Sequence, residues 1–147
     1  MVTIIDVIRK LSIDLQEKYP KYALKDRDLN DTINRPCMFI DIDDMTSSMP
    51  AVGYVQDTNN LELYVFCEDL ETGFLECLDR KNELLDYLGN PIEVTGEDDT
   101  YTILSDNLTC EISKADKALK ISFTVDLIQE LPQKDKDLPF MEELEVH

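Results

Sequence analysis

The sequence has no tryptophan, only four glycines and a single histidine. Because the one histidine, His147, is the last residue, no Ser-His-Asp, Cys-His or two-histidine metal arrangement can be assembled on a folded core. The glycines never cluster, which excludes a glycine-rich phosphate-binding loop. We therefore predict that the protein is not an enzyme and that it uses no cofactor and no bound metal.

Long apolar runs are also missing. Charged residues interrupt the N-terminal segment, and nowhere does the chain approach the roughly 18 consecutive apolar residues of a membrane-spanning helix. No small-residue cleavage site follows the N-terminal segment, so it lacks the pattern of a signal peptide. We expect a protein without membrane contact that is made and kept in the cytoplasm of the producing cell.

Basic residues are few. The 14 Lys and Arg residues stand against 32 Asp and Glu residues, which gives a formal net charge of -18. Such a charge repels nucleic-acid phosphates and anionic lipids, and it favours basic or cation-rich partners. We therefore expect no sequence-specific nucleic-acid binding. A second interpretation is that the charge only keeps the protein soluble and monomeric.

The four cysteines, Cys37, Cys67, Cys77 and Cys110, have neither the spacing of a zinc site nor that of a redox motif. Each lies within an apolar pattern, where a free cysteine behaves as a small apolar side chain. We predict buried, reduced thiols, with disulfide formation and metal ligation as the alternatives.

Two acidic clusters, residues 41–44 and 97–99, contain the carboxylates that Ca²⁺ or Mg²⁺ prefers. The first cannot begin an EF-hand loop, because it lacks the glycine and the glutamate that such a loop requires. The second has the composition of a hairpin turn. We interpret both as solvated or interface carboxylates.

Two stretches have the apolar periodicity of amphipathic helices. The first is predicted over residues 3–19 and ends at Pro20. The second is predicted over residues 71–88, with stop signals at Gly89 and Pro91. The predicted buried stripes are Ile4, Ile8, Leu11 and Leu15 in the first helix and Phe74, Leu78, Leu85 and Leu88 in the second.

Alternation of apolar and polar residues predicts the strands, most clearly over residues 119–127. The other predicted strands are residues 37–42, 53–66, 92–95, 101–104 and 108–112, with a short extended piece near 22–24. Residues 43–52, rich in Ser, Met and Asp, are predicted to be a loop or hairpin tip. In the strand over 53–66 the face with Tyr64 and Phe66 is only partly polar, which suits contact with another subunit or element.

This order of elements predicts an α+β fold with two helices packed on a largely antiparallel mixed β-sheet. We expect a single domain over residues 1–131, followed by an extended C-terminal arm over residues 132–147. The expected members of one hydrophobic core are Ile8, Leu11, Phe39, Leu63, Val65, Leu78, Leu85, Ile121, Phe123 and Val125.

The arm begins with a charged spacer between Pro132 and Pro139, after which apolar residues return. It is either frayed or docked, against a neighbouring protomer or its own domain. Its apolar residues favour docking, because disordered segments are low in hydrophobicity. The predicted assembly-interface residues are Leu138, Phe140, Met141 and Leu144 of the arm, with Met45 and Met49 of the 43–52 loop.

An ordered set of short segments carries a family resemblance. The set is Leu15-x-x-Lys-Tyr-Pro20, Arg35-Pro-Cys-Met-Phe-Ile40, Leu63-Tyr-Val-Phe66, a helix, Glu111-Ile112, Asp116, Leu119-Lys-Ile-Ser-Phe-Thr-Val125 and Met141-Glu-Glu-Leu-Glu-Val146. In this order the segments resemble the tail terminator proteins of phages and phage-tail-like bacteriocins, over most of the chain. Residues 43–60 depart from the family, since they lack the basic residues that the resembling strands often carry at their start.

The resemblance implies a small structural protein that assembles into a ring, a hexamer, on the head-proximal end of the tail tube. Such a ring stops tube polymerisation and gives the next component a platform. The implied partners are other copies of the protein, the tail tube protein, the sheath and a head connector. The protein would act in the cytoplasm of the producing bacterium and then become part of the phage tail or tail-like particle.

Two other functions fit the same residues. Another head-tail connector or tail-completion protein of the same particle would share the ring. An acidic inhibitor that mimics nucleic acid would use the net charge and would work as a monomer or dimer. Its acids would be expected at regular spacing on helices, whereas many acids here are predicted in turns and in the arm.

Overall fold

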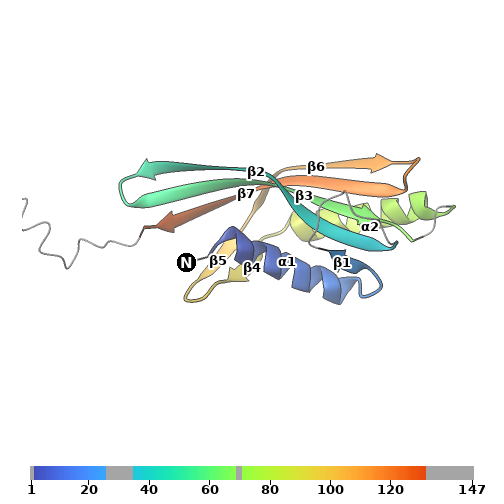
Figure 1. Ribbon diagram of the computed structural model, residues 1–147, viewed down its shortest axis with the longest axis horizontal. Coiled ribbons are helices and arrows are strands. Elements are labelled where there is room, and N and C mark those ends of the chain that lie inside the picture. The colour runs from blue at the N-terminus through green and yellow to red at the C-terminus, as the bar shows by residue number, and fades with distance from the viewer. Residues whose placement is uncertain (1, 26–34, 69–70, 132–147) are drawn as a thin grey trace, which may run out of the picture.

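The computed structural model describes residues 2–25, 35–68 and 71–131 of the chain (Figure 1). The elements in chain order are α1 (Ile4–Lys18), β1 (Ala23–Lys25), β2 (Cys37–Ala51), β3 (Tyr54–Phe66), α2 (Gly73–Leu88), β4 (Ile92–Thr95), β5 (Thr100–Ile103), β6 (Ser105–Ser113) and β7 (Ala118–Glu130). Neither described helix has the length and apolar character that crossing a membrane requires. Both predicted helices are confirmed.

Five strands form one mixed sheet in the order β1-β2-β3-β7-β6, and β4 and β5 form a separate hairpin. In the larger sheet β1 and β2 run parallel, and the other neighbouring strands run antiparallel. Strands β3 and β7 pair over their whole length, from Tyr54 opposite Glu130 to Phe66 opposite Ala118. The predicted fold, two helices on a largely antiparallel mixed sheet, is confirmed.

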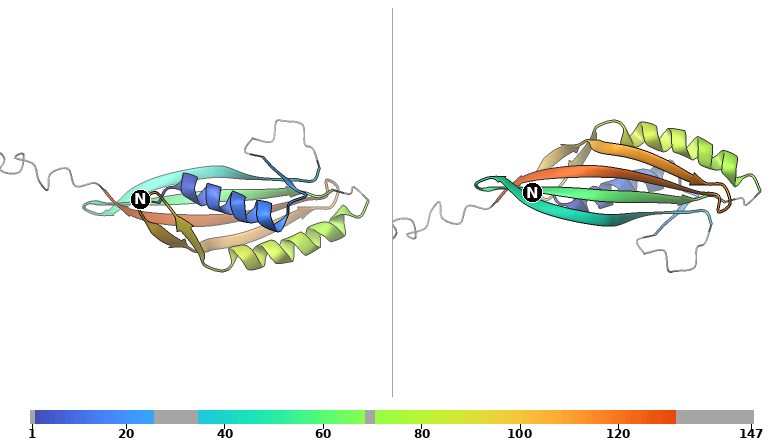
Figure 2. Two further views of the ribbon diagram at one scale, coloured as in Figure 1. Left: turned by 90° about the horizontal axis from the view of Figure 1, so that it is seen from below. Right: turned by 90° about the horizontal axis from the view of Figure 1, so that it is seen from above.

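The described helices and the β4–β5 hairpin lie on one side of the large sheet (Figure 1). Seen from below, α1 lies in front of the strands, whereas from above it lies behind them; α2 runs along the β6 edge of the sheet in both views (Figure 2). We call the side that the described helices leave uncovered the open face. One row across it is formed by Phe39, Tyr64 and Lys120, which lie opposite one another on β2, β3 and β7.

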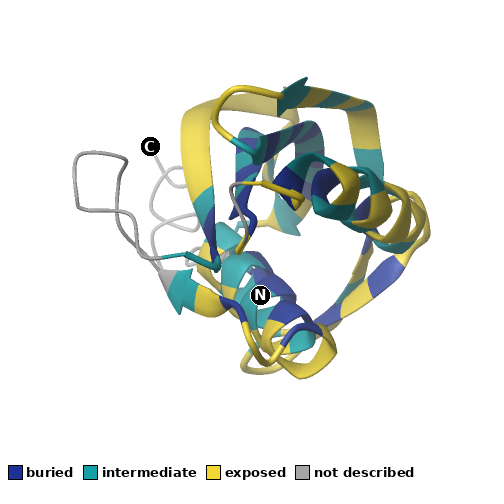
Figure 3. Cartoon of the chain, turned by 90° about the vertical axis from the view of Figure 1, so that its right-hand side faces the viewer, coloured by how far each residue is buried: buried dark blue, intermediate teal, exposed yellow. Residues whose placement is uncertain are grey.

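The hydrophobic core lies between the sheet and the helices (Figure 3). Leu63 and Val65 of β3 pair with Ile121 and Leu119 of β7, and all four are buried. The predicted core residues that are buried in this cluster are Leu11, Leu63, Val65, Ile121, Phe123 and Val125. The predicted core residues that are only half-buried are Ile8, Leu78 and Leu85.

The prediction that Phe39 belongs to this core is wrong. Phe39 is buried in a separate small cluster with Cys37 and Phe66, on the open face. Odd- and even-numbered residues are all apolar at the start of β2, so the alternation of apolar and polar residues could not decide which of them face the helices.

The helices turn a slightly different stripe towards the sheet than predicted. The buried residues are Val7, Leu11 and Leu15 in α1 and Gly73, Cys77, Leu84 and Leu88 in α2. The half-buried residues of the predicted stripes are Ile4, Ile8, Phe74, Leu78 and Leu85. The apolar stripe of an amphipathic helix is wide, so its composition fits two neighbouring sets of positions, and packing selects one.

The prediction of a loop or hairpin tip over residues 43–52 is right only at its end: β2 continues to Ala51, and the hairpin turns at residues 52 and 53. Polar pairs join this distal half to β3, and the Ser47 hydroxyl donates to the Asp57 carboxylate at 2.6 Å. Along the same stretch β3 is paired with β7 on its other side. Pairing with β3 therefore keeps residues 43–51 in a strand, although their composition alone favours a turn.

The outer edge of β2 has a different environment from its inner edge. Strand β1 pairs with β2 only up to Phe39, so within the described residues the outer edge from Ile40 to Ala51 has no partner strand. The register slips at Asp43, which forms a β-bulge. The hairpin then turns at Gly53, whose φ of 88° suits a residue without a Cβ atom.

Helix α1 begins with a capping box formed by Thr3 and Asp6. The Thr3 backbone N–H donates to an Asp6 carboxylate oxygen at 2.9 Å, and the Asp6 backbone N–H donates to the Thr3 hydroxyl at 3.4 Å. The hydrogen bond from the Thr3 backbone favours the ionised carboxylate and lowers the pKa of Asp6.

None of the four cysteines forms a disulfide in the structure. Cys37, Cys67 and Cys77 are buried, and Cys110 is half-buried. The sulfur atoms of Cys67 and Cys77 lie 3.0 Å apart, across the contact between the end of β3 and α2. Burial raises the pKa of Cys67 and also that of Cys110, which keeps both thiols protonated near neutral pH.

Candidate assembly interface

Three aromatic rings lie together on the open face, near the beginning of β7. The Phe39 ring stacks on Tyr64, with centroids 4.8 Å apart, and on Phe66, with centroids 5.9 Å apart. Alternation along β2 and β3 places all three side chains on the same face. We call Phe39, Tyr64 and Phe66 the aromatic cluster. Its presence agrees with the expectation that this face of β3 is only partly polar.

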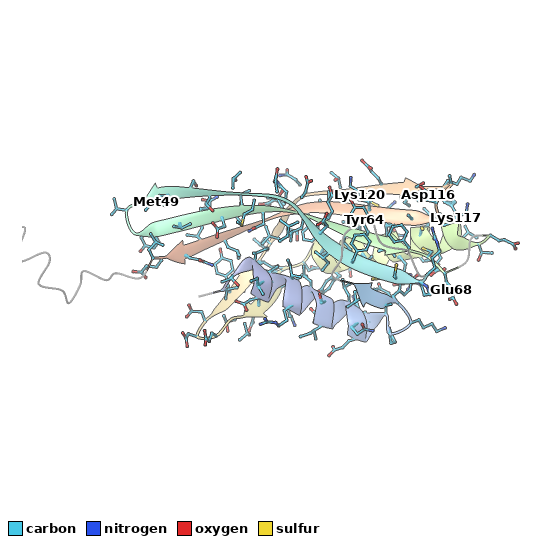
Figure 4. The ribbon with its side chains drawn as sticks, viewed as in Figure 1. Met49, Tyr64, Glu68, Asp116, Lys117 and Lys120 are labelled. Carbon is cyan, nitrogen blue, oxygen red and sulfur yellow. The ribbon has the colours of Figure 1, made fainter. Side chains whose placement is uncertain are left out.

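A charged pair borders the aromatic cluster. The Tyr64 hydroxyl donates to the Glu62 carboxylate, and burial together with this hydrogen bond raises the pKa of Tyr64. The Lys120 ammonium lies 3.6 Å from the same carboxylate, and Figure 4 shows Lys120 beside Tyr64. Within β2, β3, β6 and β7 Lys120 is the single basic residue. The one positive charge of these strands therefore lies next to the aromatic cluster.

Arg35 joins the end of β3 to the turn between β6 and β7. Its guanidinium lies 5.5 Å from the centroid of the Phe66 ring. It donates to the carbonyl oxygens of Cys67 at 3.0 Å and Lys117 at 3.1 Å, and also to that of Asp116. Sequence reasoning gave Arg35 no structural role, because its partners are backbone carbonyls that no residue pattern reveals.

The surface beside the aromatic cluster is hollowed into a groove of about 550 Å³, which we call the β6–β7 groove. Its apolar lining is formed by Phe66, Ile112, Ala118 and Leu119, and the charged side chains that line it are Arg35, Lys120, Glu111 and Asp116. Such a groove suits an apolar side chain that is carried by a charged segment.

The opposite end of the same sheet is the tip of the β2–β3 hairpin, residues 46–56. No residue in this range is charged, although the chain as a whole carries a net charge of -18. Val52 is 97% exposed and Met49 is 61% exposed. Met49 lies at the end of the sheet opposite Tyr64 and Lys120 (Figure 4). The tip is therefore uncharged and presents apolar side chains.

Between the two ends the open face is acidic. The cluster at residues 41–44 lies within β2 and not in a loop, and Asp41 is opposite Glu62. The Asn60 amide donates to the Asp44 carboxylate. Nowhere in the described ranges do three or more His, Cys, Asp or Glu side chains form a group that could hold a metal ion. The Asp44 carboxylate is thus tied to β3 by a hydrogen bond across the strand pair.

The predicted interface residues fall in different places. Met45 and Met49 are exposed on the distal half of β2. The four arm residues Leu138, Phe140, Met141 and Leu144 lie outside the described residues. Met49 is at the hairpin end of the sheet, away from the β6–β7 groove (Figure 4). An interface role for these six residues stays a prediction.

Comparison with known proteins adds one match. The model of a family described as phage tail terminator protein matches residues 6–137. No curated protein matches the chain. The aromatic cluster, the β6–β7 groove and the hairpin tip all lie within the matched residues, and the apolar part of the arm lies beyond them.

Proposed function

This chain belongs to the phage tail terminator family, and we propose that it ends the tail tube as a hexameric ring on the head-proximal end. Family membership makes it a structural, non-enzymatic component of a phage tail, and it implies interaction with the tail tube. A ring seated on the growing end would stop polymerisation and present a different surface to the next component, such as a head connector.

The observation that supports a ring is the difference between the two ends of the sheet. One end carries the β6–β7 groove, and the other carries the protruding hairpin tip with Met49 and Val52. Contact between unlike surfaces of identical subunits is heterologous. It forms a closed ring when repeating the rotation from one subunit to the next returns to the first subunit. A surface with two unlike ends is what such a contact needs.

Charge supports contact at these two places. Copies with a net charge of -18 repel one another wherever their acidic surfaces meet. The hairpin tip, residues 46–56, adds no charge to that repulsion. At the β6–β7 groove Arg35 and Lys120 offset Glu111 and Asp116. Copies can therefore approach one another at the tip and the groove with the least electrostatic cost.

Negative-stain imaging of tail tubes mixed with the purified protein tests the proposal. We expect a ring on one end of each tube and tubes that no longer lengthen. The variant Val52→Asp should fold but fail to form rings, because it adds a charge at the exposed tip. The matched control Leu75→Asp, at an apolar residue that is 66% exposed on α2, should still form them.

Two results would contradict the proposal. Tubes that keep growing, with no density added at either end, would contradict both the ring and its placement at the end of the tube. Rings that form equally well with Val52→Asp would place the contact between copies elsewhere. A connector or tail-completion protein would bind only tubes that already carry a terminator, so bare tubes separate that alternative from termination.

A further inference from the structure

We propose that the β6–β7 groove receives the apolar part of the C-terminal arm, residues 138–144, from a neighbouring copy of the chain. This inference rests on the proposed ring, and it names the contact that links one copy to the next. Its occupant is a segment of this chain, and the groove lies on the open face between Arg35 and Lys120.

The chemistry of the groove fits that of the arm. The arm segment carries Leu138, Phe140, Met141 and Leu144, which are apolar, together with Glu142 and Glu143. The groove offers apolar residues for the first group, and at its border Arg35 and Lys120 balance Glu111 and Asp116, so its lining carries no net formal charge. An acidic, apolar segment therefore finds apolar partners at a place that does not add to the repulsion between acidic copies.

Another hollow on the open face fits the arm poorly. It measures about 310 Å³ and lies near the bulge in β2. Its ionisable lining residues are Asp43 and Glu62, and no lysine or arginine lines it. An arm that carries glutamates would meet two carboxylates there, of which Lys120 pairs with one, Glu62. The lining of the β6–β7 groove, with two cations against two carboxylates, repels the arm less.

Chain length indicates that the arm comes from another copy. The arm starts after Leu131, whose N–H donates to the Gly53 carbonyl at 2.7 Å, at the hairpin end of the sheet. At about 3.4 Å per residue, β7 separates Leu131 from Lys120 by about 37 Å. A fully extended chain from Leu131 to Phe140 spans at most about 32 Å. Phe140 therefore ends short of Lys120 in its own chain, whereas the 13 residues from Leu131 to Leu144 span up to about 47 Å. Only a neighbouring copy can thus bring the whole segment 138–144 to the groove.

A head-to-tail arrangement removes this shortfall. It brings the hairpin end of one copy, where the arm begins, next to the groove end of the following copy. Each arm then has to cross only the contact between two copies, and every copy both gives and receives an arm. This is a heterologous contact of the kind that a closed ring repeats.

Cysteine cross-linking in the full-length chain tests the inference. One variant carries Phe140→Cys and a second carries Glu111→Cys, at an exposed residue that lines the groove. Both also carry Cys110→Ser, so that the native thiols left in them are the buried ones. The two variants are mixed with tail tubes under mild oxidation. We expect a disulfide-linked heterodimer on a non-reducing gel, identified by mass spectrometry.

The matched control replaces Glu111→Cys by Ser48→Cys, an exposed position at the hairpin end of the same strand system. The heterodimer should be lost with this control. A single chain that carries both Phe140→Cys and Glu111→Cys should give a ladder of linked oligomers and no internally linked monomer.

The outcomes separate this inference from the proposed ring. Rings on the tubes without the Phe140 to Glu111 cross-link would overturn the arm contact and leave the ring standing. An internally linked monomer would overturn it too, since the arm would then fold back on its own chain. The cross-linked heterodimer in the absence of any ring would support the arm contact and overturn the ring.

Discussion

The Arg35 guanidinium donates a hydrogen bond of 3.1 Å to the carbonyl oxygen of Lys117. The same group donates to the carbonyl of Cys67 at 3.0 Å, so the end of β3 and the turn before β7 share one donor. Because Arg35 also lines the β6–β7 groove, the shape of the groove depends on this connection.

Replacing Arg35 should therefore affect stability. We expect Arg35→Ala to lower the free energy of unfolding by roughly 1.5 to 3 kcal/mol, since several carbonyls lose a charged donor. Arg35→Lys should recover only part of this loss, because an ammonium lacks the planar fork of a guanidinium. Urea denaturation measures both variants. Arg9→Ala, at a side chain that is 66% exposed, should stay within about 0.5 kcal/mol of the parent; an Arg35→Ala midpoint equal to the parent's would contradict this role.

Phe123 tests the core. Its side chain is 2% exposed between the sheet and the helices. Phe123→Ala should cost roughly 3 to 5 kcal/mol of unfolding free energy, because it removes buried apolar contacts and leaves a cavity. The control is Ile128→Ala on the same strand, at a residue that is 49% exposed. Equal denaturation midpoints for the two variants would show that the face of β7 with Phe123 is not the one turned towards the helices.

The capping box gives a pH dependence with a defined sign. The folded state holds the pKa of Asp6 below its ordinary value, through the hydrogen bond from the Thr3 backbone. The stabilisation is therefore complete above that value and is lost as the pH falls through the lowered pKa. The stability advantage of the parent over Asp6→Asn should shrink in this acid range, as followed by thermal unfolding.

A second variant checks the cause of the Asp6 shift. Thr3→Ala removes the hydroxyl but keeps the backbone N–H, so the pKa of Asp6 should rise only part of the way to its ordinary value. NMR titration of the Asp6 carboxyl measures this directly. A full return to the ordinary value in Thr3→Ala would assign the shift to the hydroxyl and not to the backbone.

Thiol reactivity should follow burial. We expect intact mass under non-reducing conditions to show four free cysteines, and a thiol reagent to modify half-buried Cys110 before the buried Cys37, Cys67 and Cys77. Cys110→Ser should remove the fast phase. Two missing hydrogens in the mass would instead indicate a disulfide, and the 3.0 Å between the sulfurs of Cys67 and Cys77 makes that pair the first to examine.

The boundary between domain and arm can be tested by truncation. A chain that ends at Leu131 should fold, because the core cluster of the described residues lies before that position. It should fail to cap tubes, because the arm contact is lost from every copy of the ring. Circular dichroism and tail-length measurements report the two properties separately. Folded, truncated protein that still gives tails of uniform length would show that assembly does not use the arm, whereas failure to fold would place the arm in its own core.

Periodicity in the sequence predicts much of the architecture. Both helices and the strand that became β7 follow from it, because buried faces impose periods of 3.6 and 2 on the chain. The side on which Phe39 is buried did not follow, since Cys37 and Phe39 are as apolar as Met38 and Ile40. Where both faces of a strand carry apolar residues, only the packing of neighbouring elements decides which face is turned towards the helices.

The candidate interface was less accessible to sequence reasoning. The partly polar face of β3, which carries Tyr64 and Phe66, did suggest contact with another subunit or element. The groove beside them could not be predicted, because it depends on backbone carbonyls of the β6–β7 turn that Arg35 holds in place. The length of β2 could not be predicted either, because pairing with β3 overrides the turn composition of residues 46–52.

The outer edge of β2 bears on how copies of the protein avoid aggregation. An unpaired edge strand invites another strand to add to it, which is how sheets grow into fibrils and aggregates. Here Asp41, Asp43 and Asp44 give the edge strand negative charge, the bulge at Asp43 bends it, and Pro50 lacks a backbone N–H. The proposed ring would bring several copies to one end of a tube, and at that local concentration these features disfavour growth from sheet to sheet and leave association to other surfaces.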